Sequence, residues 1–280
     1  MVILSVAYLF LPVRPDTAGG AEQILAMLDR ALVDQGHTSL VIAQAGSRPE
    51  GILHALPAIS GTIDDTARAR VHDDCRGIIA STLDQTSVDL IHMHGLDFDR
   101  YLPEPGLPVL VTLHLPIHWY PPGSIPGSRT GTFYNCVSES QHRTCAPDPA
   151  LLPYVENGIS EHLFTAVAHP RGFALFLGRI CPEKGCDRAL EAARIAGIDL
   201  TIAGQVFPYP DHLRYFEQEI KPHLDGQRLR YVGPVGPDDK AHLLASARCL
   251  LLPSTAPETS SRSEERRVGK ECRSRWSPYH

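Results

Sequence analysis

The stretch Met1-Val-Ile-Leu-Ser-Val-Ala-Tyr-Leu-Phe-Leu-Pro-Val13 opens the chain, and Gly19-Gly20 separates it from residues 21–35. The short apolar run predicts a buried strand over residues 2–10. Residues 21–35 have apolar side chains at helical spacing and end at Gly36, which predicts a helix that stops at a glycine. A strand, a glycine turn and a helix form the unit from which parallel sheets are built. The apolar positions of the helix are Ile24, Leu25, Leu28, Ala31 and Leu32.

The alternation of strands and helices continues along the chain, which implies parallel sheets that are buried on both faces and joined by right-handed crossovers. A stretch with Pro and Gly at residues 166–172 predicts the boundary between a first domain, residues 1–168, and a second, residues 169–261. Further strands are predicted at 39–43, 89–93, 109–114, 131–138, 173–177, 200–203, 229–232 and 249–252. Further helices are predicted at 66–84, 185–196, 211–223 and 237–247, and the third of these is expected to break near Pro222.

Composition describes an ordinary globular protein. The 280 residues are 43% hydrophobic and 21% charged, which suits two domains of moderate size. A net charge of −6 argues against a nucleic-acid partner but not against a phosphate-bearing ligand. The seven cysteines are scattered without a CxxC pair, which favours free thiols in a reducing compartment.

The apolar N-terminus has neither the charged region nor the cleavage site of a signal peptide. No run reaches the roughly 18 apolar residues of a membrane span. We therefore predict a cytoplasmic protein with no transmembrane segment, and peripheral contact with a membrane is left open.

Residues 262–280 differ in character from the rest. They show neither helical nor strand periodicity, and they resemble the conceptual translation of a common high-throughput sequencing adapter. The alternative is a solvated basic tail that binds nucleic acid or membrane. We interpret the segment as a non-native tail, which removes Cys272 and Trp276 from the native protein.

Gly19 and Gly20 lie where the first strand meets the first helix. Glycines there let the backbone approach a ligand, and a helix N-terminus offers N–H groups to a phosphate. The alternative is a flexible turn. The absence of a GxGxxG motif disfavours a dinucleotide-dependent oxidoreductase.

The segment Gly178-Arg-Ile-Cys-Pro-Glu-Lys-Gly185 is more informative. It follows a predicted strand and opens a predicted helix, at the carboxyl end of the strand where parallel sheets bind ligands. Arg179 and Lys184 together have the charge to neutralise a diphosphate without a metal ion. The alternative is a surface loop with two solvated cations.

Three groupings of metal-binding residue types are weaker alternatives. His92, His94 and His114 suit a metal-dependent hydrolase, since side chains two apart on a strand share a face, but they have no nearby carboxylate. Cys136, His142 and Cys145 lack a fourth ligand. Asp97 and Asp99 form an Asp-x-Asp pair, a spacing that arises by chance in a chain this rich in aspartate.

The order of short motifs over residues 1–261 resembles the family-4 retaining glycosyltransferases of the GT-B fold. The segment containing Arg179 and Lys184 and the segment from Leu252 to Glu258 are the most specific. The motifs are Gly19-Gly-Ala-Glu22, Asp89-Leu-Ile-His-Met-His-Gly95, Val111-Thr-Leu-His114, Val137-Ser-Glu139, Asn157-Gly-Ile159, Gly178-Arg179 with Pro182-Glu-Lys-Gly185, Ala203-Gly204, Val232-Gly233, and Leu252-Pro-Ser254 with Pro257-Glu258.

This resemblance implies two Rossmann-like α/β domains facing a cleft, the second incomplete in this chain. It implies a hexosyltransferase-like enzyme that moves a sugar from a nucleotide-diphosphate donor to an acceptor with retention of configuration. No metal and no cofactor besides the donor are expected. The acceptor, a sugar, a lipid or another small molecule, is beyond the sequence.

The resemblance also assigns roles. His114 and Glu258 are the implied catalytic residues, the first near the reacting centre and the second on the hydroxyls of the transferred sugar. The implied donor-binding residues are Gly19, Gly20, Arg179, Lys184 and Gly185.

One departure bears on activity. The family has a second Glu eight residues after Glu258, which binds the donor ribose, and this chain has Arg266 there. The chain as written is therefore expected to be truncated and inactive, whatever the parent gene encodes. A non-catalytic sugar-nucleotide-binding protein and a nucleotide-sugar 2-epimerase are the alternatives.

Overall fold

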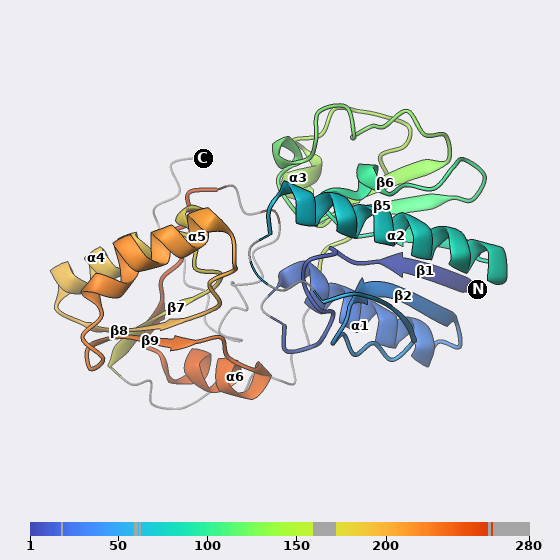
Figure 1. Cartoon of the computed structure of the whole chain (residues 1–280). Coiled ribbons are helices and arrows are strands. Elements are labelled where there is room, and N and C mark those ends of the chain that lie inside the picture. Colours follow the sequence, from blue (N-terminus) through green and yellow to red (C-terminus); the bar gives the residue numbers. More distant parts are fainter. Residues whose placement is uncertain (18, 59–60, 62, 159–171, 257–258, 260–280) are drawn as a thin grey trace. The chain divides into compact units, whose positions relative to one another are not determined.

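The computed structural model describes residues 1–17, 19–58, 61, 63–158, 172–256 and 259. Contacts divide the chain into two compact units (Figure 1). The first comprises Met1–Gly158 with Phe207–Arg214 and Ala256–Ser260, and the described part of the second is residues 172–206 and 215–255. The predicted boundary at 166–172 and the tail from residue 262 fall almost wholly outside the described residues.

The first unit contains a six-stranded parallel sheet in the order β3-β2-β1-β4-β5-β6. Sheet growth reverses at β1, because β2 and β3 lie on one side of it and β4 to β6 on the other. Such a reversal opens a crevice at the carboxyl ends of the two strands that flank it. The strands are β1 (Val2–Val6), β2 (Thr38–Gln44), β3 (Ile52–Leu56), β4 (Leu90–Met93), β5 (Val109–Leu113) and β6 (Thr132–Cys136).

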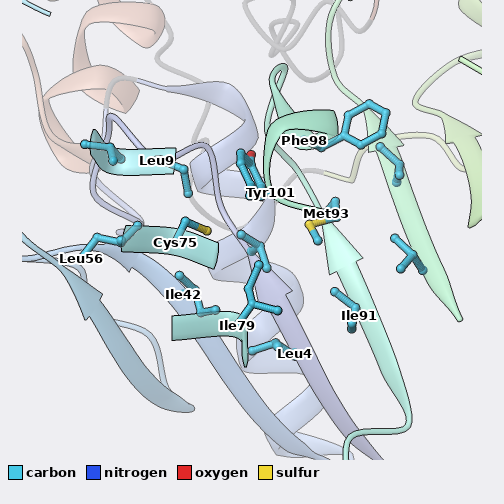
Figure 2. Close-up of a cluster of buried hydrophobic side chains, with 14 of the residues drawn as sticks. Leu4, Leu9, Ile42, Leu56, Cys75, Ile79, Ile91, Met93, Phe98 and Tyr101 are labelled. Atoms are coloured by element: carbon cyan, nitrogen blue, oxygen red, sulfur yellow. The ribbon is translucent and has the colours of Figure 1, made fainter. Parts of the chain in front are cut away.

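Helices cover both faces of this sheet. Ile79 of α2 packs with Leu4 and Ile42 in the larger core (Figure 2). Leu25 of α1 packs with Val41 in a separate cluster. Adjacent residues of a strand point to opposite faces, so α1 and α2 lie on opposite faces of the sheet. The helices are α1 (Gly20–Asp34), α2 (Asp65–Gln85) and the single turn α3 (Glu139–His142).

The second unit repeats the plan on four parallel strands in the order β10-β7-β8-β9. Phe176 packs with Leu190 of α4, while the adjacent Leu175 packs with Leu243 of α6, so these helices also cover opposite faces. β8 and β9 lie on one side of β7 and β10 lies on the other, so the order of the strands reverses between β7 and β10. The elements of this unit are β7 (Phe173–Leu177), α4 (Cys186–Ala196), β8 (Asp199–Ala203), β9 (Leu229–Gly233), α6 (Pro237–Ser246) and β10 (Cys249–Leu250). The short helix α5 (Pro210–Tyr215), which comes between β8 and β9 in the chain, belongs to the first unit except for Tyr215.

The predicted class, α/β with parallel sheets in two Rossmann-like domains, is confirmed, and most predicted elements recur within two residues. Two elements were missed, β3 and α3. The helix predicted at 211–223 was expected to break near Pro222, but the α-helix ends earlier, in a π-type turn at Phe216–Ile220 that is followed by a 3-10 turn at Lys221–His223. Pro222 has no N–H and cannot continue an α-helix. Within the described residues, none of the helices has the length and apolarity that a membrane crossing needs.

The buried face of α1 differs from the predicted apolar stripe. Ile24, Leu28 and Leu32 are only half-buried, and Ala31 is exposed. The fully buried positions are Glu22, Leu25, Ala26 and Asp29. A buried carboxylate is tolerated when it is hydrogen-bonded.

The carboxylate of Asp29 joins three elements. It accepts hydrogen bonds from Ser39 Oγ at 2.6 Å, from the Glu50 N–H at 2.6 Å and from the Gly51 N–H at 3.3 Å. Since Ser39 is on β2 and Gly51 precedes β3, Asp29 fixes α1 against both strands. This network explains why a charged residue occupies the core face of the helix.

Asp29→Ala is expected to lower the free energy of unfolding of the first unit by about 2–4 kcal/mol, because it leaves a buried hydroxyl and two N–H groups without an acceptor. Urea titration followed by circular dichroism measures the change. Asp34→Ala is the control on the same helix: Asp34 is exposed and 3.8 Å from Arg30, so the expected change is under about 0.5 kcal/mol. Equal effects of the two substitutions would contradict the assigned role of Asp29.

Candidate functional site

The strand ends at the two reversal points carry most of the predicted site residues. In the first unit, β1 leads toward Gly19 and Gly20, and β4 leads into His94. In the second unit, β7 leads into the segment 178–185, and β10 leads into residues 253–255. Each unit therefore carries predicted site residues at the position where parallel sheets bind ligands.

The glycine pair at the start of α1 is asymmetric. Gly19 is the N-cap residue, and a Cβ there would lie 1.7 Å from Glu22 Oε2. A Cβ on Gly20 would meet nothing within 4 Å. The space beside the helix N-terminus is thus at Gly20, while Gly19 is confined by a buried carboxylate that itself interacts favourably with the helix dipole.

The segment containing Arg179 and Lys184 is braced along its length. The carbonyl of Glu183 accepts hydrogen bonds from the Thr255 N–H at 2.8 Å and from Ser254 Oγ at 3.1 Å. The Ile180 N–H donates to the Gln205 carbonyl at 3.0 Å. Two cations are therefore held, both partly buried, in a segment that is fixed from the ends of β8 and β10.

Two glycines make this bracing sterically feasible. Gly185 has φ +66°, and a Cβ there would lie 2.3 Å from the Pro253 carbonyl oxygen. Gly204 has φ +156°, and a Cβ there would lie 1.7 Å from the Gly178 carbonyl oxygen. Both positions combine a backbone conformation that favours glycine with a contact that leaves no room for a side chain.

His114 follows β5 in the first unit, and its backbone is fixed on both sides. The buried Gln141 side chain donates from Nε2 to the Leu113 carbonyl at 2.7 Å and to the Leu115 carbonyl at 2.9 Å. The hydroxyl of Thr259 donates to the His114 carbonyl at 2.7 Å. Glu258 itself lies outside the described residues, but its neighbour Thr259 is in direct contact with His114.

Gln141 and Thr259 were not recognised from the sequence. Gln141 forms all the hydrogen bonds its amide needs here, because Oε1 also accepts from the Val137 N–H at 2.8 Å. A Gln two residues after the Val137-Ser-Glu139 motif was the available signal, but only the tertiary structure shows which carbonyls it meets.

The three histidines take part in two separate hydrogen bonds and do not point their nitrogens at one common position. His92 Nε2 lies 2.7 Å from Thr112 Oγ1, and His94 Nδ1 lies 3.0 Å from His114 Nε2. Burial lowers the pKa of His92 to about 4 and that of His94 well below its usual value. These rings are neutral and bonded to protein groups, which disfavours the metal-dependent hydrolase.

The other two metal groupings are also engaged in internal contacts. Asp97 pairs with His72 at 2.6 Å and accepts a hydrogen bond from Tyr101 at 3.1 Å. Cys136 Sγ and Cys145 Sγ lie 3.5 Å apart as free thiols. Asp97 and the two thiols are therefore already in contact with protein groups.

The segment containing Arg179 and Lys184 lies in a region of the chain that matches the model of a known protein family. Residues 163–262 match the family model of group 1 glycosyl transferases. Among proteins of curated function, none matches the sequence.

Solved glycosyltransferases share the fold. AviGT4, involved in avilamycin A biosynthesis, gives a TM-score of 0.63 at 21% identity over 94% of this chain and 75% of its own. Sucrose-phosphate synthase from Thermosynechococcus elongatus gives 0.70 at 16% identity over 94% and 77%. The catalytic domain of Arabidopsis thaliana starch synthase IV, bound to ADP and acarbose, gives 0.60 at 14% identity over 91% and 78%. The chain therefore has the GT-B glycosyltransferase fold and spans about three-quarters of these structures.

Gly185→Ala is expected to destabilise the second unit by about 3–5 kcal/mol, because it adds an overpacking contact to the cost of a positive φ. Gly197→Ala is the matched control. Gly197 has φ +65°, but a Cβ there meets nothing within 4 Å, so about 1–2 kcal/mol is expected. Chemical denaturation measures both, and equal values would show that the contact with Pro253 contributes nothing.

Gln141→Glu is expected to cost about 2–4 kcal/mol at neutral pH, since a carboxylate cannot donate to the carbonyls on either side of His114. Glu139→Gln makes the opposite change on the same turn, where Glu139 is exposed and pairs with the exposed Arg143. Its effect is expected to stay under about 0.5 kcal/mol. A Gln141→Glu variant as stable as the parent chain would refute the bracing of His114.

Proposed function

We propose that the parent protein transfers a sugar from a nucleotide-diphosphate donor to an acceptor with retention of configuration and without a metal ion. The observation that carries this proposal is the braced loop containing Arg179 and Lys184 at the reversal point of the second sheet. Its family match and the glycosyltransferase fold of both units support the proposal. ADP bound to starch synthase IV shows that this fold accommodates a nucleoside diphosphate.

In the proposed reaction, the bond from the anomeric carbon to the donor phosphate breaks, and the acceptor oxygen bonds to the same face of that carbon. Arg179 and Lys184 stabilise the negative charge that grows on the leaving diphosphate. That diphosphate takes the proton of the acceptor hydroxyl. His114 and Glu258 contact the transferred sugar, and Gly20 gives the donor room beside the N-terminus of α1.

The proposal extends to the surroundings of the reaction. The free thiols are those expected in the cytoplasm, where we place the protein. A sugar, a lipid or another small molecule is the proposed acceptor.

Inorganic pyrophosphate tests the diphosphate site alone, because it needs neither the ribose contact nor the acceptor. Arg179→Gln and Lys184→Gln are each expected to weaken pyrophosphate and ADP binding by about 10- to 100-fold, the effect of a lost charge-assisted hydrogen bond. Isothermal titration calorimetry measures it. Arg194→Gln removes the same charge from the exposed end of α4, where Arg194 pairs with Glu191, and should leave binding unchanged.

Four outcomes are informative. Pyrophosphate binding that all three variants retain equally would contradict the proposed site. Binding that depends on Arg179 and Lys184, together with sugar transfer by the parent gene product, would establish the transferase. The same binding with no transfer favours the binding protein, and release of an epimerised sugar favours the 2-epimerase.

A further inference from the structure

His94 is a buried histidine with an incomplete set of hydrogen bonds. It is 3% exposed, Nδ1 faces His114 Nε2 at 3.0 Å, and Nε2 is buried with no hydrogen-bond partner among the residues that the structure describes. The His92 ring lies beside it, tilted by 39°, with 4.1 Å between centroids. A neutral imidazole has one N–H and one lone pair, so the position of the His94 proton determines what Nε2 leaves unsatisfied.

The hydrogen bonds that link His92, Thr112 and Asn135 show how the position of such a proton is assigned. The Thr112 hydroxyl donates its only proton to Asn135 Oδ1 at 2.8 Å. Its oxygen can then only accept from His92, so His92 carries its proton on Nε2. This fixes His92 as a neutral donor and shows that hydrogen bonds across β4, β5 and β6 determine tautomers in this part of the sheet.

For His94 the two tautomers differ in cost. A proton on Nε2 would leave a buried N–H with no acceptor, which proteins rarely tolerate. A proton on Nδ1 leaves only an unused lone pair there and allows Nδ1–H to donate to His114. The charges that act on His94 come from His92 on its own strand and His114 after β5, and neither is a carboxylate that would hold a second proton.

We propose that His94 is a positioning residue, which donates from Nδ1 to Nε2 of His114 and thereby fixes His114 as the neutral tautomer with its proton on Nδ1. What this tautomer serves rests on the proposed function, in which His114 contacts the transferred sugar. The ring then acts there as a neutral hydrogen-bond donor. Protonation of His114 at Nε2 would require His94 to accept instead, and this would create the unpaired buried Nε2–H.

Long-range ¹H–¹⁵N correlation spectra of the ¹⁵N-histidine-labelled chain report the tautomer of each histidine directly. At neutral pH, His114 is expected to carry its proton on Nδ1 with a preference of about tenfold or more. The signals of His114 are identified as those that are missing from the spectrum of the His114→Asn variant. A wild-type spectrum with the His114 proton on Nε2 overturns the proposal, and this measurement requires no other variant to fold.

Three variants separate positioning from packing. Asn places its amide nitrogen near the position of a histidine Nδ1, so His94→Asn is expected to retain the tautomer of His114. His94→Phe keeps the ring but removes the donor, and the preference should be lost. His92→Gln changes the other buried histidine and keeps a donor toward Thr112, so it should leave the tautomer of His114 unchanged. An unaltered preference in His94→Phe also overturns the proposal.

This readout is independent of the proposed function. The spectra are recorded without a nucleotide-sugar donor and without an acceptor substrate. Pyrophosphate binding, in contrast, is proposed to depend on Arg179 and Lys184 in the other unit. Loss of pyrophosphate binding with the tautomer intact would reject the proposed function alone. Intact binding with the wrong tautomer would reject the inference alone.

Discussion

Parallel pairing of one strand on both of its edges is the constraint on which each unit depends. β1 pairs with β2 and β4, and β7 pairs with β8 and β10. Because all strands are parallel, every carboxyl end points to one edge of its sheet, and the connections on the two sides of the central strand diverge there. The glycine pair of the first unit and the cationic loop of the second are placed by this topology before any side chain contributes.

Buried polar groups then fix the details that topology leaves open. Asp29 locks α1 to two strands, Gln141 holds the backbone around His114, and Thr112 orients His92. In each case a polar side chain is buried because its partners meet its hydrogen-bonding capacity, which makes the arrangement specific. Apolar packing alone fills the core but does not select one rotamer or one tautomer at these positions.

The sequence predicted the alternation, the parallel sheets and the loop containing Arg179 and Lys184, because each leaves a local signal of period or motif. β3 was missed because it is a half-exposed edge strand with His54 at its centre. α3 was missed because four residues cannot show helical periodicity. The buried face of α1 was misjudged because Asp29 reads as a surface residue until its partners on β2 and before β3 are known. Gln141 and the pairing of His94 with His114 depend on contacts between strands, which no local pattern encodes.

The close approach of Gly204 to Gly178 limits how this protein can diversify. A Cβ on Gly204 would lie 1.7 Å from the Gly178 carbonyl oxygen, whereas a Cβ on Gly178 would meet nothing within 4 Å, so Gly204 is the position that is closed to substitution. Sequence change at this strand end is therefore accommodated beyond Gly204, in the part of the connection that begins at Gln205. Directed evolution of the second unit should insert or exchange residues there and leave Gly204 untouched.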